Sequence, residues 1–332
     1  MQTCMKGKNL LCEQDWTNEE IETLLRVADE LKMRYLLGQE TEILKNKTVF
    51  MLFFEESTRT RNAFECGITQ LGGHANYLTP KATQIDHGET PKETINVLGR
   101  MGHAVGVRNT FVGGHKWMAE LAKYSKIPVY NMQCDIWHPT QSFADLFTIK
   151  EKFNNELKGR KFVISWTSAG KYMRPLSMAN SLVTLMPRFG MDVTLAHPKG
   201  FELTPEVLAM AKSNAERYGS KFEVVNDMDA ACEGADVIYA KGWGPIMTVG
   251  DDAKAGLEMI NQNPGWIVDS RRMALGTKDA IYMHCMPADR DIEVTSEVMD
   301  GPQSVLYDEA ENRMHTIKAL MALTMGNVMC RR

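Results

Sequence analysis

The residues from Ser57 to Arg61 form a short segment that could bind a phosphate group. They read Ser-Thr-Arg-Thr-Arg and directly follow the β-rich run Thr48–Phe54. At the start of a helix, unpaired amide hydrogens and the helix dipole favour an anion, and arginine adds charge-assisted hydrogen bonds to phosphate. The same residues would also suit an ordinary helix N-cap with solvated arginines. The segment by itself leaves both interpretations open.

Four further motifs carry residue types that such a site would need. They are Arg108 after an apolar run, His138-Pro139-Thr140-Gln141, His284-Cys285-Met286-Pro287, and Glu311-Asn312-Arg313-Met314-His315. Arginine donates hydrogen bonds to anionic oxygen atoms, and histidine can also donate. Taken alone, His138 would be interpreted as a packed or helix-capping histidine. Its Pro-x-Gln context favours a role in binding.

In this order the motifs resemble those of the aspartate and ornithine transcarbamylase superfamily. The family signatures Ser-x-Arg-Thr-Arg, His-Pro-x-Gln and His-Cys-Leu-Pro are matched nearly letter for letter, with Met286 in place of the usual leucine. The resemblance extends over essentially the whole chain. It implies a carbamoyltransferase that binds carbamoyl phosphate and reacts it with a small nitrogen nucleophile, with no need for a cofactor or a metal.

The resemblance also implies roles for individual residues. Those that would hold the phosphate are Ser57, Thr58, Arg59 and Thr60, and those that would complete the site around the carbamoyl group are Arg108, His138, Gln141 and Arg313. Negative charge develops on the carbamoyl oxygen in the tetrahedral intermediate, so fixed donors at that oxygen would lower the barrier. The predicted catalytic donors are Thr60, Arg108 and His138.

Cys285 invites the hypothesis of a nucleophile, but no general-base partner is evident and phosphate already leaves well. The resemblance implies that the backbone carbonyl groups of Cys285 and Met286 accept hydrogen bonds from the carbamoyl NH₂ group, around a cis Met286-Pro287 bond. Cys285 is therefore counted with the catalytic residues, but is expected to act mainly through its main chain.

The polar stretch 82–90 resembles the family's mobile loop, which enters the active site of a neighbouring subunit. Gln84 and His87 would present groups to carbamoyl phosphate bound by that neighbour. The resemblance therefore implies a homotrimer or a dimer of trimers. Without the resemblance, the stretch would be interpreted as a plain surface loop.

The residues expected to bind the second substrate differ from those of the ornithine enzymes. Those enzymes carry Asp-x-x-x-Ser-Met-Gly after a strand, whereas here the strand leads into Lys241-Gly242-Trp243-Gly244. A cation there would repel an ammonium group and attract a carboxylate or ureido group, although a solvated loop lysine would look the same. The segment with Lys171 and Arg174 partly resembles the aspartate enzyme's carboxylate-binding segment. The predicted second-substrate residues are Lys171, Arg174, Lys241 and Trp243.

These segments look closest to a catabolic branch of the family linked to purine and allantoin breakdown, for which 2,3-diureidopropionate has been proposed as a substrate. This interpretation predicts a small anionic or ureido-type nucleophile. Two alternatives stay open: an anabolic ornithine or aspartate carbamoyltransferase, and a non-catalytic regulatory homologue that binds carbamoyl phosphate. The branch is knotted, so a threaded loop near residue 240 is expected as well, although knots are rare.

Strand-like apolar runs alternate with helix-like stretches along the whole chain. The expected strands include 48–54, 105–107, 127–130, 162–166, 193–196, 224–225, 237–239, 266–268 and 281–283. Such alternation predicts an α/β fold with two doubly wound parallel-sheet domains. A carbamoyl phosphate domain is expected at 1–150, joined by a C-terminal helix 313–332, and a second-substrate domain at 151–312.

Composition narrows the classes of partner. The 332 residues are 44% hydrophobic and 24% charged, which is typical of a globular protein of two domains. The net charge of −4 and the scattered basic residues argue against nucleic acid and against an anionic membrane surface. The longest apolar run is too short to cross a bilayer and the first residues lack a signal pattern, so the predicted location is the cytoplasm. Seven cysteines without a Cys-x-x-Cys pair argue against a disulfide framework and a structural zinc site.

Overall fold

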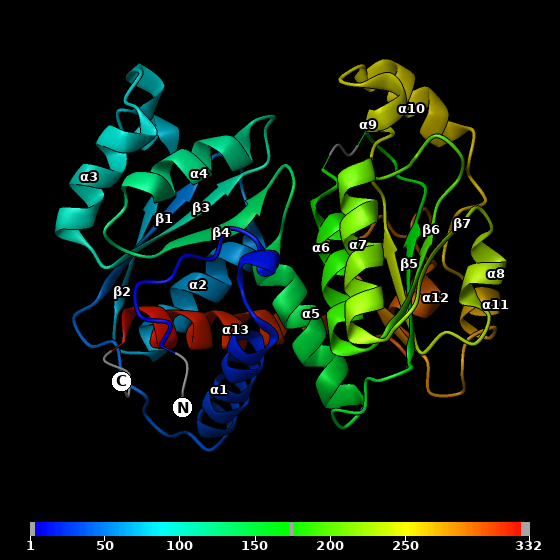
Figure 1. Cartoon of the computed structure of the whole chain (residues 1–332), viewed down its shortest axis with the longest axis horizontal. Coiled ribbons are helices and arrows are strands. Elements are labelled where there is room, and N and C mark those ends of the chain that lie inside the picture. Colours follow the sequence, from blue (N-terminus) through cyan, green and yellow to red (C-terminus); the bar gives the residue numbers. More distant parts are fainter. Residues whose placement is uncertain (1–3, 173–174, 327–332) are drawn as a thin grey trace. The chain divides into compact units, whose positions relative to one another are not determined.

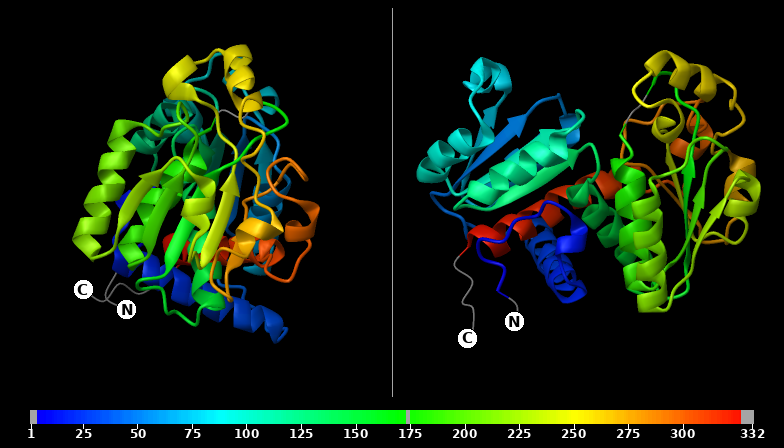
Figure 2. Two further views of the ribbon diagram at one scale, coloured as in Figure 1. Left: turned by 90° about the vertical axis from the view of Figure 1, so that its right-hand side faces the viewer. Right: turned by 45° about the horizontal axis from the view of Figure 1, so that its top comes forward.

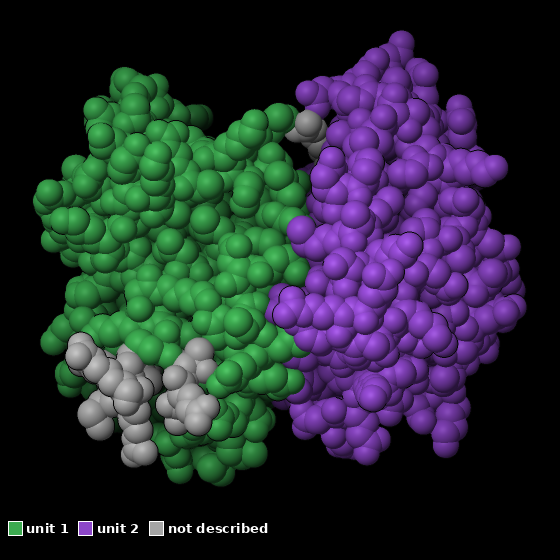
Figure 3. All heavy atoms as spheres, viewed as in Figure 1, with its two compact units in different colours: residues 1–147, 310–332 green, residues 148–309 purple. Residues whose placement is uncertain are grey.

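The computed structural model of the chain describes residues 4–172 and 175–326. The chain divides into two compact units, which we call unit 1 (residues 1–147 and 310–332) and unit 2 (residues 148–309) (Figure 1, Figure 3). The chain passes from one unit to the other within two helices, α5 (Pro139–Lys152) and α13 (Leu306–Met325). Each unit contains its own parallel sheet with helices, which confirms the predicted fold class.

Unit 1 is built on a four-stranded parallel sheet in the order β2-β1-β3-β4. The strands are β1 (Thr48–Phe53), β2 (His74–Leu78), β3 (Ala104–Asn109) and β4 (Val129–Cys134). Besides parts of α5 and α13, its helices are α1 (Asn18–Leu36), α2 (Thr58–Gln70), α3 (Pro91–Met101) and α4 (Gly114–Tyr124), with short 3-10 turns η1 (Glu13–Asp15), η2 (Pro80–Ala82) and η3 (Ile85–His87). Helices α3 and α4 cover one face of the sheet, and α2 and α13 cover the other (Figure 1).

Unit 2 is built on a five-stranded parallel sheet in the order β7-β6-β5-β8-β9. The strands are β5 (Lys161–Trp166), β6 (Asp192–Ala196), β7 (Phe222–Val225), β8 (Val237–Lys241) and β9 (Ile281–Met283). The helices include α6 (Ser177–Leu185), η4 (Met186–Phe189), α7 (Pro205–Tyr218), α8 (Met228–Cys232), α9 (Ile246–Val249), α10 (Ala253–Asn261), α11 (Ser270–Met273) and α12 (Ser296–Met299). Helices α6 and α7 cover one face and α8, α11 and α12 the other (Figure 1, Figure 2).

Both sheets have one position where successive connections run to opposite sides. In unit 1 the chain runs from β1 to β2 on one side and then crosses to β3 on the other; in unit 2 it runs from β5 to β6 and β7 and then crosses to β8. In open parallel sheets, ligands bind in the crevice at the carboxyl ends of the strands at this switch point. The loops after β1, β3, β5 and β8 are therefore where a functional site is expected.

Local sequence explains where the helices begin. Helix α1 starts with a capping box: the Thr17 hydroxyl accepts from the Glu20 amide at 3.2 Å, and the Glu20 carboxylate accepts from the Thr17 amide at 2.8 Å. The apolar side chains that follow at helical spacing, including Ile21 and Leu24, are fully buried. Both the start signal and the apolar face of this helix are visible in the sequence.

Some expectations differ from the structure. The predicted strand 266–268 is absent, because Val268 forms only an isolated bridge to Val294. Strand β2 was not predicted, since it lies at the sheet edge with its side chains partly or fully exposed and so has no apolar run. Cysteines 12, 66, 134, 232 and 285 are free thiols, whereas Cys4 is disulfide-bonded, which its spacing did not indicate.

Within the described residues, no helix combines the length and the apolar character that crossing a membrane requires. The same part of the chain holds no group of three or more histidine, cysteine, aspartate or glutamate residues placed to bind a metal ion.

Candidate active site

The segment Ser57–Arg61 forms the first turn of α2, directly after β1. Ser57 is the N-cap, and its hydroxyl oxygen accepts a hydrogen bond from the Thr60 amide at 3.3 Å. Arg61 is engaged elsewhere, with its guanidinium group 3.9 Å from the centre of the Tyr77 ring and its Nε 3.4 Å from the Glu65 carboxylate. The turn is thus a capped helix start whose amide groups can face an anion.

Arg108 lies at the carboxyl end of β3, which pairs with β1 in the sheet. Its Nε lies 3.9 Å from Oε2 of Glu55. The other oxygen of Glu55 accepts hydrogen bonds from both the amide and the hydroxyl of Thr110, at 2.8 and 2.9 Å. Glu55 is therefore a fixed counter-ion that restricts the position of the Arg108 side chain.

His138 immediately precedes α5 and is only 4% exposed. Burial, then the Arg313 guanidinium and then the Arg108 guanidinium together hold the pKa of His138 well below its usual value. At neutral pH the ring is therefore uncharged, and it can donate one hydrogen bond without adding positive charge. Gln141, one turn further on, is fully buried and donates to the Asp145 carboxylate at 2.5 Å.

Arg313 reaches this region from α13, 175 residues away from His138 in the sequence. It is 3% exposed, and its Nη1 donates to the Thr60 hydroxyl at 3.5 Å. Unit 1 thus brings together one residue each from α2, β3, the start of α5 and α13. We call Thr60, Arg108, His138 and Arg313 the donor cluster. Two guanidinium groups, a hydroxyl and a neutral imidazole can bind a phosphate group and stabilise negative charge on a carbonyl oxygen.

The remaining unit 1 residues predicted for the site are more exposed. Thr58 is exposed and Arg59 is half-buried in the first turn of α2. Gln84 and His87 are exposed on the loop with η3, where the carbonyl group of Gln84 accepts hydrogen bonds from the amides of His87 and Glu89 at 2.9 and 3.1 Å. The loop is thus an ordered turn on the surface of unit 1.

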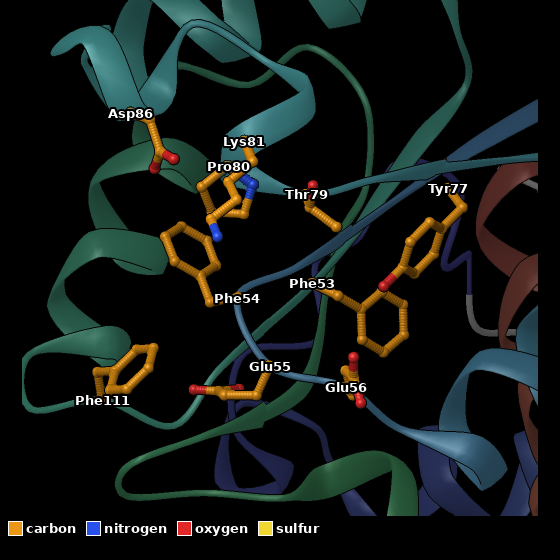
Figure 4. A pocket seen from close by; sticks show the side chains of 10 residues that line it. All are labelled: Phe53, Phe54, Glu55, Glu56, Tyr77, Thr79, Pro80, Lys81, Asp86 and Phe111. Carbon is orange, nitrogen blue, oxygen red and sulfur yellow. The ribbon is translucent and has the colours of Figure 1, made fainter.

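A cavity of about 400 Å³ lies at the carboxyl ends of β1 and β2, just before the first turn of α2 in the sequence. It is lined by Phe53, Phe54, Glu55, Glu56, Tyr77, Thr79, Pro80, Lys81, Asp86 and Phe111 (Figure 4). Three carboxylates and only one ammonium group line it, so the cavity does not favour a phosphate group. The guanidinium groups of Arg108 and Arg313 belong to the donor cluster and do not line this cavity.

Lys241 ends β8 in unit 2 and is 8% exposed, so it is not a solvated loop lysine. Its Nζ lies 3.8 Å from Oε1 of Glu293, which is itself 3% exposed. The same oxygen accepts hydrogen bonds from the Gly242 amide at 2.8 Å and the Thr167 hydroxyl at 3.3 Å. Although burial opposes ionisation, the Lys241 ammonium group, the His284 ring and the hydrogen bonds to the carboxylate hold the pKa of Glu293 well below its usual value. The charge of Lys241 is therefore largely compensated.

The motif with His284, Cys285 and Met286 follows β9 and is tied to the same carboxylate. His284 Nε2 lies 3.4 Å from the Glu293 oxygen, and the Met286 amide donates to His284 Nδ1 at 2.7 Å. Since Nδ1 accepts, the proton of the neutral ring is on Nε2, which donates to Glu293. The predicted cis peptide bond between Met286 and Pro287 is present. We call Thr167, Lys241, Gly242, His284 and Glu293 the Glu293 cluster.

The other residues predicted for the second substrate have different surroundings. Lys171 is exposed, and Arg174 lies outside the described residues. Trp243 is 1% exposed, and its indole N–H donates to the Phe201 carbonyl at 2.9 Å. Its own carbonyl accepts from the Trp166 indole at 2.8 Å. Trp243 therefore anchors the chain after β8 to the core, and its indole N–H is committed within the protein.

Glu55 and Glu293 are the main residues that the sequence patterns missed. Neither belongs to a recognised motif, and a single acidic residue carries no local signal of burial. Glu293 lies in Asp-Ile-Glu-Val-Thr, eight residues after Cys285, and only the fold brings it to Lys241.

Comparison with known proteins agrees with this geometry. The family model described as "Aspartate/ornithine carbamoyltransferase, carbamoyl-P binding domain" matches residues 8–151, and the model of the Asp/Orn binding domain matches residues 174–324. The chain is 39% identical to an ornithine carbamoyltransferase of Thermococcus kodakarensis over 328 residues, 99% of each chain. It is also 39% identical to that of Halalkalibacterium halodurans over 323 residues, 97% of each chain.

Solved structures show the same similarity. The ornithine carbamoyltransferase from Pyrococcus furiosus superposes with a TM-score of 0.88 at 38% identity, covering 98% of this chain and 100% of that one. An acetylornithine transcarbamylase in complex with acetylcitrulline gives a TM-score of 0.88 at 35% identity, covering 96% and 100%. The chain belongs to the aspartate/ornithine carbamoyltransferase family. It is a carbamoyltransferase, so the alternative of a non-catalytic homologue is set aside.

Proposed function

We propose that the protein transfers the carbamoyl group of carbamoyl phosphate to the side-chain amine of an amino acid of the ornithine class. The observation that carries the proposal is the donor cluster, in which Thr60, Arg108 and Arg313 from three elements come together with the neutral His138 of a fourth. Full-length similarity to enzymes named ornithine carbamoyltransferase supports this substrate class over the hypothesis that the enzyme degrades a ureido acid. None of the relatives described above carries a name linked to purine breakdown.

In the proposed reaction, the uncharged amine attacks the carbonyl carbon of carbamoyl phosphate. A tetrahedral intermediate forms, with negative charge on the former carbonyl oxygen, and the C–O bond to phosphate then breaks. Arg108, His138 and Thr60 donate to the developing oxyanion, and Arg313 adds positive charge. The amine proton leaves with the phosphate, and the products are a ureido compound and inorganic phosphate. Unit 1 thus supplies the carbamoyl phosphate site.

Phosphate binding is assigned to the first turn of α2. Ser57, Thr58 and Arg59 supply amide, hydroxyl and guanidinium donors there. Gln141 is assigned to the carbamoyl pocket, where its fixed contact with Asp145 orients it. Cys285 and Met286 of unit 2 are assigned to the carbamoyl NH₂ group through their backbone carbonyl groups, in the cis turn that His284 supports.

A second candidate substrate is an amino acid of this class whose α-amino group is acylated. The ornithine enzymes share an aspartate that pairs with the ammonium group of the substrate. The resemblance places Lys241 at the corresponding position of this chain. The ion pair of Lys241 with Glu293 leaves no net negative charge there for an α-ammonium group, whereas an amide group needs none. Similarity to the acetylornithine transcarbamylase complexed with acetylcitrulline is consistent with this candidate. Lys171 and Arg174 would contribute charge for a carboxylate.

A substrate panel tests the proposal. Purified protein and carbamoyl phosphate are incubated with ornithine, N-acetylornithine, aspartate or no acceptor, and phosphate release and ureido product are measured. Saturable turnover of ornithine or N-acetylornithine is expected, and their ratio separates the two candidates. Phosphorolysis of 2,3-diureidopropionate in the reverse direction, without turnover of either ornithine compound, would overturn the proposal in favour of the catabolic reading. Turnover of aspartate alone would also overturn it.

The resemblance further suggests a homotrimer or a dimer of trimers, in which Gln84 and His87 reach the site of a neighbour, and a cytoplasmic location. Sedimentation of the purified protein tests the assembly. The threaded loop near residue 240 also stays a prediction.

A further inference from the structure

The ring of Tyr172 occupies a notch formed by two glycines of unit 2. A Cβ atom on Gly244 would lie 2.9 Å from Cε2, Cζ and Oη of Tyr172. A Cβ atom on Gly256 would lie 2.3 Å from Cε2 and 2.7 Å from Cδ2 of the same ring. Both distances are shorter than van der Waals contact, so any side chain at either position would displace the ring.

The backbone conformation does not explain these glycines. Neither Gly244 nor Gly256 has a positive φ. Gly256 lies inside α10, where glycine is less favourable than alanine for helix formation. The space that Tyr172 needs is therefore the physical reason for a glycine at position 256, and the close contact at Gly244 has the same cause.

Tyr172 also contacts the chain between these glycines. Its hydroxyl donates to the Gly250 carbonyl at 3.4 Å. We call residues 244–256 the α9 segment; Tyr172 thus touches its beginning, middle and end. A further contact comes from Thr248, whose hydroxyl donates to the Gly200 carbonyl at 2.7 Å. Met247, Thr248 and Gly250 are exposed, so the segment has little core of its own.

The contacts of Tyr172 lie at the carboxyl edge of the unit 2 sheet, where ligands bind in open parallel sheets. The loop with Tyr172 follows β5 and the α9 segment follows β8, and these neighbouring strands flank the switch point of the unit 2 sheet. Upstream of Gly244, the chain is fixed by the Gly242 amide on Glu293 and by the buried Trp243. Tyr172 therefore holds the part of this edge that the core does not hold.

We infer that Tyr172 is a positioning residue that fixes the α9 segment over the carboxyl edge of the unit 2 sheet and thereby sets the affinity for the second substrate. The inference rests on the proposed function only for its second half, the effect on substrate affinity. Tyr172 acts through the segment and is not assigned to the reacting atoms.

The experiment compares Tyr172→Ala and Tyr172→Phe with Tyr218→Ala, a matched tyrosine control at the end of α7. Trypsin cleavage after Lys254, an exposed residue of the α9 segment, is followed by mass spectrometry. For Tyr172→Ala we expect cleavage to accelerate about tenfold, because the segment opens more often. KM for the amine should rise about tenfold, while the Kd for carbamoyl phosphate stays within about twofold of wild type. Tyr172→Phe keeps the ring and should stay close to wild type in each measurement.

A double-mutant cycle tests the notch directly. Gly256→Ala should act like Tyr172→Ala, because its methyl group displaces the ring. In the Tyr172→Ala background the same change should cause no further acceleration of cleavage and no further rise in KM, since the ring is gone. Additive effects would overturn the inference, as would cleavage of Tyr172→Ala at the rate of Tyr218→Ala. Faster cleavage without any amine turnover by the wild type would support the positioning role and would overturn the proposed substrate class alone.

Discussion

The donor cluster of unit 1 and the Glu293 cluster of unit 2 each place a cation at the carboxyl end of a central strand, Arg108 on β3 and Lys241 on β8, but the charge is compensated differently in the two clusters. In unit 1, two arginines lie near a neutral histidine, and the carboxylate of Glu55 is 3.9 Å from Arg108. In unit 2, Lys241 faces a buried, ionised Glu293. The Glu293 carboxylate also accepts four hydrogen bonds, from two amide groups, one hydroxyl group and the His284 ring. Unit 1 therefore keeps positive charge for an anionic ligand, whereas unit 2 uses its cation to hold the protein together.

This difference explains why the sequence predicts the ligand of unit 1 more readily than the ligand of unit 2. Excess positive charge indicates its ligand directly, because only an anion offsets it. A compensated pair says little about the ligand, and the substrate is then selected by shape and by the placement of segments such as residues 244–256.

Removing the cation of unit 2 should have the largest effect on stability. Lys241→Met leaves the buried Glu293 carboxylate without its main counter-charge, and we expect a loss of about 3–5 kcal/mol in the free energy of unfolding. Urea denaturation at pH 7 measures it. The double variant Lys241→Met/Glu293→Gln should recover part of the loss, because no uncompensated charge remains. A single variant as stable as the wild type would mean that Lys241 is available to a ligand after all.

Removing a cation of unit 1 should affect catalysis more than folding. Arg108→Gln removes a donor to the developing oxyanion, so kcat is expected to fall by about 10²–10³. The melting temperature should change little, since Arg108 is charged for a ligand and not for the core. Steady-state kinetics and thermal unfolding measure the two effects. The control is Arg100→Gln on the exposed face of α3, and a kcat equal to that of this control would remove Arg108 from the mechanism.

Arg59 and Arg61, two arginines of one helical turn, allow a direct test of which side chain binds the phosphate group. Arg59→Ala should lose about 2–4 kcal/mol of carbamoyl phosphate binding, because a charge-assisted hydrogen bond to phosphate is lost. Arg61→Ala is the matched control, since Arg61 contacts Tyr77 and Glu65 and an exposed ion pair contributes less than about 1 kcal/mol. Calorimetric titration compares them. Equal losses for both variants would show that the phosphate does not distinguish the two arginines.

The smallest expected effect concerns pH. His138 has a lowered pKa in the folded protein, so the unfolded chain binds its proton more readily. Below pH about 6.5, the usual histidine value, stability should therefore fall by up to about 1.4 kcal/mol per pH unit, and above it the contribution is fully present. Unfolding measured from pH 5 to 8 should show a flatter profile for His138→Asn. The exposed His74→Asn should keep the wild-type slope, and an identical slope in all three proteins would contradict a buried neutral His138.

Much of the fold could be predicted from local patterns. The apolar strands β1 and β5 and the capping box of α1 are short-range signals, and α/β alternation leads to doubly wound sheets. The edge strand β2 could not be predicted, because its exposed residues carry no apolar period. The strand predicted at 266–268 does not form, because Val268 makes only an isolated bridge to Val294, and this contact depends on tertiary packing.

Residue type and motif alone were enough to predict a carbamoyl phosphate site from Ser57 to Arg61, Arg108, His138 and Arg313. Which of these charges remain available to a ligand depends on contacts between distant segments. Glu55 lies 53 residues from Arg108 and Glu293 lies 52 residues from Lys241, and a counter-ion at such a separation leaves no trace in the local pattern around the cation. Burial sets both the charge state of His138 and the strength of the Lys241–Glu293 pair, and burial arises only when distant segments pack together.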